Sequence, residues 1–93
     1  YKNPQPVPNS SNIVFSGFQP AKNQWDIYMY DRTAKCIKRL TDGGGNKLDP
    51  AVSPDQNQLV YTLQTEGNSQ IFEQKFLIPE GCTSPQELAL PQK

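Results

Sequence analysis

The sequence predicts an all-β protein built from two four-stranded antiparallel sheets. Three observations lead to this prediction: the apolar runs are short and rich in Val, Ile, Phe and Tyr, turn-forming residues separate them, and the pattern recurs after a shift of 46 residues. β-branched and aromatic residues in short runs favour strands. The longest helix-compatible segment lies near the C-terminus, and Pro85 and Pro91 bracket it too closely for a helix.

The repeat spans nearly the whole chain of 93 residues. The matched positions are Pro4 with Pro50, Pro8 with Pro54, Ile13-Val14-Phe15 with Leu59-Val60-Tyr61, Cys36 with Cys82 and, once two residues are dropped from a loop of the first copy, Ile27-Tyr28 with Ile71-Phe72. A repeat of this length is the size of one four-stranded unit. We therefore expect a single β domain, residues 1–93, made of one repeat over about 1–46 and a second over about 47–93.

Each repeat predicts four strands in the same order. The expected ranges are 4–8 and 49–53 for the first strand, 12–18 and 58–64 for the second, 25–31 and 69–76 for the third, and 36–41 and 85–90 for the fourth. Pro50 suits an edge strand or a strand start, because no ladder donor is needed there. Ser53-Pro54-Asp55-Gln56 suits a type I turn with Pro at its second position.

The middle of the chain resembles a known repeat family. Arg39-Leu40-Thr41, Pro50-Ala51, Ser53-Pro54-Asp55, Leu59-Val60-Tyr61 and Ile27-Tyr28 with Asp31 are similar to the TolB-type WD40-like (PD40) β-propeller repeat. Gln56 stands where that family usually has Gly. The resemblance implies blade-like sheets. Closed propellers have typically 4–8 blades, so two repeats predict either an incomplete propeller or two sheets packed as a sandwich.

Composition and motifs argue against several function classes. Nine basic residues balance nine acidic ones, so the electrostatic term that drives nucleic-acid binding is missing. No apolar stretch approaches the roughly 20 residues that span a bilayer. The chain has no His, and the Gly43-Gly44-Gly45 stretch lacks P-loop spacing and predicts a flexible connection. We expect no enzyme activity and no catalytic, cofactor or metal site.

Two sets of residues are candidates for a role beyond the sheets. Trp25, Tyr28 and Tyr30 could form an interaction surface, although packing between sheets is the simpler role for them. Cys36 and Cys82 occupy equivalent places in the two repeats. On the outer parts of adjacent blades they would lie beyond disulfide reach of about 7 Å between Cα atoms, whereas two facing sheets would allow the bond.

The resemblance implies a non-catalytic protein-binding or scaffolding module in the periplasm or cell envelope. The alternative is a fragment or accessory domain of a propeller-containing enzyme of the peptidase or polysaccharide lyase type. In the continuous apolar runs "IVF" and "LVY", apolar side chains point to both faces of the strand. Since a bare apolar face is unusual on a monomer, we expect a protein partner or self-association.

Overall fold

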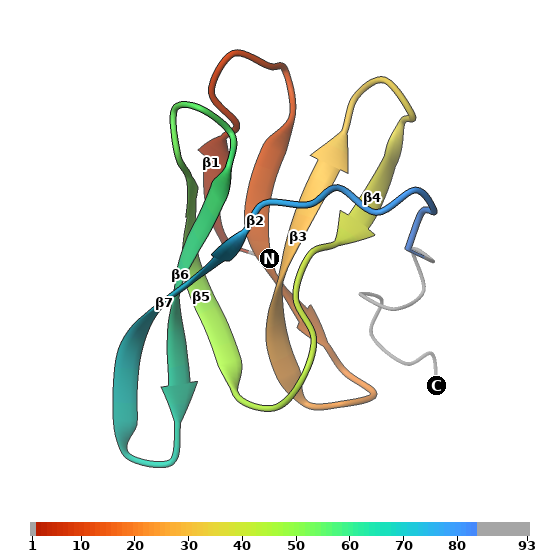
Figure 1. Cartoon of the computed structure of the whole chain (residues 1–93). Helices are drawn as coiled ribbons and strands as arrows, with labels where there is room; N and C mark the ends of the chain where they lie inside the picture. Colours follow the sequence, from red (N-terminus) through yellow and green to blue (C-terminus); the bar gives the residue numbers. More distant parts are fainter. Residues whose placement is uncertain (1, 84–93) are drawn as a thin grey trace.

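All regular elements of the described residues, 2–83 in this computed structural model, are β-strands. The strands are β1 (Lys2–Pro6), β2 (Ile13–Gln19), β3 (Gln24–Asp31), β4 (Cys36–Arg39), β5 (Asn46–Val52), β6 (Gln58–Thr65) and β7 (Asn68–Lys75). They form two antiparallel sheets (Figure 1). Sheet 1 has the order β1-β2-β3-β4 and sheet 2 the order β5-β6-β7. The predicted all-β architecture of two antiparallel sheets is confirmed.

Seven of the eight predicted strands are present, within three residues of their expected bounds. Sheet 2 has three strands among the described residues, and the expected strand over 85–90 lies outside them. β4 is shorter than expected because pairing with β3 stops at Arg39, opposite Tyr28. The chain nevertheless stays beside β3. The N–H of Ile27 donates to the hydroxyl of Thr41, and the N–H of Trp25 donates to the side-chain oxygen of Asn46.

The backbone repeats itself at the same shift of 46 residues as the sequence. In β1–β2 the partners are Lys2 with Ser16, Gln5 with Val14 and Pro6 with Ile13; in β5–β6 they are Leu48 with Thr62, Ala51 with Val60 and Val52 with Leu59. Both pairs break register at the same place, where Asn3 and Asp49 adopt φ of 56° and 53°. Each first strand therefore carries the same β-bulge.

The turns after the first strands differ in detail. Gln56 N–H donates to the carbonyl of Ser53, which closes the predicted turn at Pro54-Asp55, and Gln56 itself has φ of 61°. A left-handed backbone favours Gly, and this chain places Gln there. In the first repeat the N–H of Ser10 donates to the carbonyl of Val7, and Asn9 takes the positive φ.

The two sheets pack on one another through one face of each. Pairing of Val14 with Met29 and of Ser16 with Ile27 puts these side chains on one face of sheet 1. The core cluster consists of Val7, Val14, Ile27, Met29, Val52, Leu59, Tyr61 and Phe76, with Leu40 and Leu63 against it. β5 contacts β1, β2 and β3. The first strand of sheet 2 therefore packs directly on the face of sheet 1. Phe15 and Tyr28 stack on the other face of sheet 1 and are also buried.

We expect Ile27→Val to lower the free energy of unfolding by about 0.5–1.5 kcal/mol, because Ile27 is fully buried and the substitution leaves a methyl-sized gap. The control is the same substitution at Ile71, which is 73 % exposed and should change stability by less than about 0.5 kcal/mol. Urea unfolding measures both. Equal losses would contradict the packing described here.

The turn at Asp55 should make stability depend on pH. The Ser53 hydroxyl and then the Asn57 N–H donate to the Asp55 carboxylate and hold its pKa below the usual value. A lowered folded-state pKa contributes stability above the unfolded pKa, about 4, which is lost as pH falls through the folded-state pKa. Asp55→Asn removes this contribution. We expect the stability difference between wild type and variant to be largest near pH 7 and to shrink below about pH 4. Urea unfolding across pH tests it, and a constant difference would contradict it.

Candidate interaction surface

The three aromatic residues that could form an interaction surface do not lie on one face of sheet 1. Tyr28 and Tyr30 share a face of sheet 1, and the register puts Trp25 on the opposite face. Tyr28 is fully buried, while Tyr30 is 37 % exposed. Trp25 is half-buried between the ring of Phe18 and the ammonium of Lys2, which lies 4.6 Å from the ring centroid. Tyr28 is therefore enclosed by packing, Trp25 is covered in part, and Tyr30 is the most exposed of the three.

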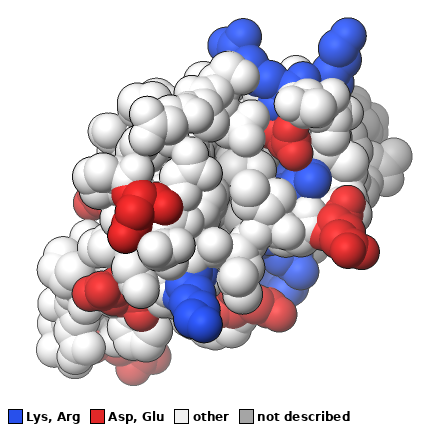
Figure 2. Space-filling view, turned by 45° about the horizontal axis from the view of Figure 1, so that its top comes forward, with Lys and Arg blue, Asp and Glu red and all other residues white. Residues whose placement is uncertain are grey.

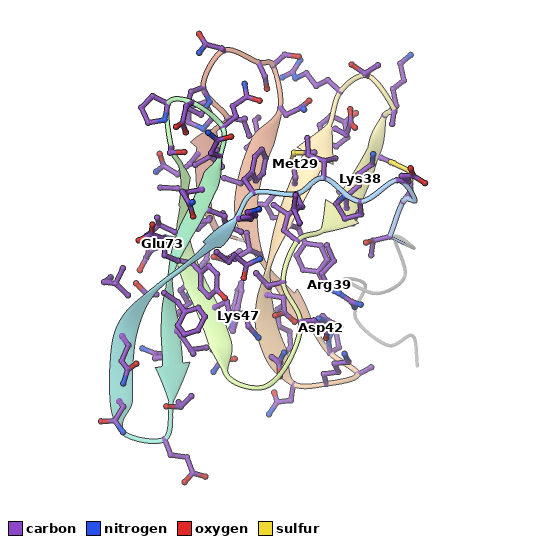
Figure 3. All side chains as sticks on the ribbon, in the orientation of Figure 1. Met29, Lys38, Arg39, Asp42, Lys47 and Glu73 are labelled. Atoms are coloured by element: carbon purple, nitrogen blue, oxygen red, sulfur yellow. A yellow bond between two sulfur atoms is a disulfide. The ribbon has the colours of Figure 1, made fainter. Side chains whose placement is uncertain are left out.

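A buried ion pair joins the two sheets. Lys47 Nζ at the start of β5 lies 3.0 Å from Asp26 Oδ1 in β3, and both side chains are almost completely buried. The Thr41 hydroxyl donates to Asp26 Oδ1 at 2.9 Å. The side-chain amides of Gln19 and Gln24 donate to Asp26 Oδ2. Figure 3 shows Lys47 where β5 passes beside sheet 1. Each carboxylate oxygen has partners, as a buried charge requires.

The glycine connection is organised around the same ammonium group. Lys47 Nζ donates to the carbonyls of Gly43, Gly44 and Gly45 at 3.0, 3.3 and 3.2 Å. Gly45 has φ of +88°, and a Cβ there would come within 2.9 Å of Leu63 Cδ1. The sequence predicted a flexible connection. In the structure the three glycine carbonyls surround the Lys47 ammonium group and accept its hydrogen bonds. The loop is therefore an ordered part of the fold.

Asp31 and Asp42 also serve local structure. Asp31 accepts hydrogen bonds from the N–H groups of Thr33 and Ala34 and lies 3.2 Å from Lys38 Nζ. The Ala34 N–H, and then Lys38, lower its pKa. Asp42 accepts from the N–H of Gly43, which lowers its pKa as well. Within the described part of the chain no group of three His, Cys, Asp or Glu side chains could hold a metal ion.

The cysteines hold the chain after β7 against the edge of sheet 1. Cys36, the first residue of β4, forms a disulfide with Cys82, visible in yellow in Figure 3. Next to it, the N–H of Thr83 donates to the carbonyl of Ile37, and the Thr83 hydroxyl accepts from the N–H of Arg39. The segment that follows β7 therefore crosses sheet 1 and bonds to the outer side of β4 (Figure 1).

Apolar exposure is concentrated on β7 and the segment after it. Of the five large hydrophobic side chains that are exposed among the described residues, four lie within 71–78: Ile71 at 73 %, Phe72 at 44 %, Leu77 at 71 % and Ile78 at 45 %. We call residues 68–78 the β7 surface. Every β7 residue except Gln74 is exposed. This surface is the candidate functional site of the chain.

Ile71 is exposed although the equivalent residue of the first repeat, Ile27, is buried. Ile71-Phe72 in β7 corresponds to Ile27-Tyr28 in β3, since Tyr61 pairs with Phe72 as Phe15 pairs with Tyr28. Sheet 2 covers Ile27 completely, whereas nothing described covers Ile71. On the same outer face of sheet 2, Val60 and Leu48 are only half-buried. The second repeat thus exposes Ile71 and part of Val60 on the face whose equivalents in the first repeat, Ile27 and Val14, are fully buried.

The formal net charge of the chain is zero. Figure 2 shows basic side chains at the upper edge of the face in view and a mixture of acidic and basic side chains below them. A shallow polar hollow at the tip of the β6–β7 hairpin is lined by residues such as Asn46, Gln64 and Asn68. It gathers no set of groups for acid–base or nucleophilic chemistry.

A scan against protein-family models found no match, and a search of curated proteins found none either. Residues 2–83 contain no helix that could cross a membrane.

Sequence reasoning missed the β7 surface and the Asp26–Lys47 pair. The repeat itself carried a signal for the former, because "IF" in the second copy aligns with the buried "IY" of the first. Nothing local distinguishes Lys47 from an exposed lysine, so the ion pair had no signal in the sequence.

Proposed function

We propose that this chain is a non-catalytic protein-binding or scaffolding module, and that the β7 surface is where a protein partner docks. The observation that carries the proposal is the contrast between Ile71, which is 73 % exposed, and its repeat-equivalent Ile27, which is fully buried. A contiguous exposed apolar patch marks an interaction site, and Ile71 shares the outer face of sheet 2 with the half-buried Leu48 and Val60. The similarity to TolB-type repeats supports the same class of function.

We also propose that the protein works in an oxidising compartment such as the periplasm or cell envelope. The Cys36–Cys82 disulfide supports this, because disulfides persist mainly outside the reducing cytosol. The expected setting of TolB-like modules agrees with it.

Site-specific photo-cross-linking tests the docking surface. A photoreactive residue at position 71, in the cells that make the protein, should give a discrete cross-linked product that mass spectrometry identifies. The control position is Thr33, which is exposed in the turn between β3 and β4. We expect a product from position 71 and none from position 33. The same products from both positions, or none from either, would contradict the proposal.

A further inference from the structure

The described strands leave four sheet edges, and three of them are protected. β1 carries Pro4 and Pro6 and a bulge, which suit an edge that pairs with nothing. β4 is bonded on its outer side to Thr83. β5 lies against sheet 1. β7 has no proline, and it pairs with β6 without interruption from Gln58–Lys75 to Thr65–Asn68. It is a long, regular edge, which is the kind that accepts another strand.

The hydrogen-bonding groups of this edge alternate in a known order. Thr65 and Asn68 flank the two-residue Glu66-Gly67 turn, so they form a hydrogen-bonded pair. Even-numbered residues of β7 therefore bond to β6, in agreement with the bond from Phe76 N–H to the Asn57 carbonyl. The N–H and C=O groups of Ser69, Ile71 and Glu73 point away from the sheet.

We infer that β7 pairs antiparallel with β7 of a second copy of this chain across a twofold axis at Ile71, joining two three-stranded sheets into one. The inference rests on the proposed binding function and names its partner. In this register Ile71 lies opposite its own copy, and Ser69 lies opposite Glu73 of the other chain. Three outward N–H groups per chain, at residues 69, 71 and 73, then find carbonyl partners.

Charge does not oppose a second copy at this edge. The strand carries one acidic residue, Glu73, and one basic residue, Lys75. Neither meets its own copy in the Ile71-centred register, so no like charges lie directly opposite. The chain as a whole has a formal net charge of zero, so two copies do not repel each other at long range. A twofold interface also closes on itself, and both β7 edges are used up in it.

The first test uses the purified full chain. Light scattering or sedimentation over a concentration series should show the mass rising from 10.4 kDa to twice that value and no further. Amide exchange followed by NMR should show Ser69, Ile71 and Glu73 slowing as the dimer forms. The inward-pointing amides of Gln70 and Phe72 should be protected at every concentration, which serves as the internal control.

Substitutions identify the edge itself. Glu73→Pro removes an outward N–H and leaves the hydrogen bonds to β6 in place. Because the dimer is twofold symmetric, the substitution removes two hydrogen bonds between the chains, one from each copy. We expect the dissociation constant of the dimer to rise by at least about tenfold. The matched control, Glu73→Ala, keeps the N–H and should change it much less. Ile71→Lys, which puts two ammonium groups opposite each other, should have the same effect as Glu73→Pro and serves if the proline variant melts early.

The outcomes separate this inference from the proposed function. A mass of 10.4 kDa throughout, with unchanged exchange at residues 69, 71 and 73, overturns the dimer. So do open-ended growth, and a dimer that both Glu73→Pro and Ile71→Lys leave intact. If the chain stays monomeric while position 71 cross-links to a different protein, the binding function stands and only the second copy is wrong. If the chain stays monomeric and position 71 gives no cross-linked product, both the dimer and the proposed binding function are contradicted.

Discussion

Asp26→Asn should lower the free energy of unfolding by about 3–5 kcal/mol, because it leaves the ammonium of Lys47 buried without a countercharge. Lys47→Met should cost a similar amount, since it strands the carboxylate of Asp26. The double variant should lose less than the sum of the two single losses, because neither charge remains buried alone. Urea unfolding of the four proteins gives the coupling.

The exposed pair Lys22–Asp42 supplies the control. Its atoms are 3.9 Å apart and its side chains are 50 % and 79 % exposed, so Lys22→Met should cost at most about 1 kcal/mol. If Lys47→Met proves no more costly than Lys22→Met, or if the losses at Asp26 and Lys47 simply add, the ion pair does not join the sheets as described.

Replacing both Cys36 and Cys82 by Ser should lower the free energy of unfolding by about 4 kcal/mol. The disulfide closes a loop with a sequence separation of 46, and the cost of closing such a loop in the unfolded chain sets this magnitude. The bond also holds the segment after β7 on β4. Chemical unfolding with intact mass measured in parallel tests the prediction.

Reductant provides the matched comparison. Wild type treated with a thiol should fall to the stability of the double Ser variant, and the variant should not respond, because the described residues contain no free cysteine. Wild type that is fully reduced by mass yet unchanged in stability would show that the bond contributes nothing.

The sequence by itself was sufficient for the seven described strands, the turn at Pro54-Asp55 and the repeat of 46 residues. These features depend on residues close together in the chain: apolar runs that suit pleated strands, prolines that fix φ, and Asp side chains that bond nearby N–H groups. The same local rules act in both repeats, which is why the bulges at Asn3 and Asp49 coincide.

Only the tertiary structure decided which face of each repeat is buried and which is exposed. Ile27 and Ile71 have equivalent local surroundings, yet one is buried by the neighbouring sheet and the other faces solvent. The pairing of Asp26 with Lys47 likewise depends on where β5 crosses β3. Cys36 meets Cys82 because the segment after β7 returns to β4. Burial and charge pairing depend on neighbours that are distant in sequence, and local preferences carry no information about which neighbours arrive.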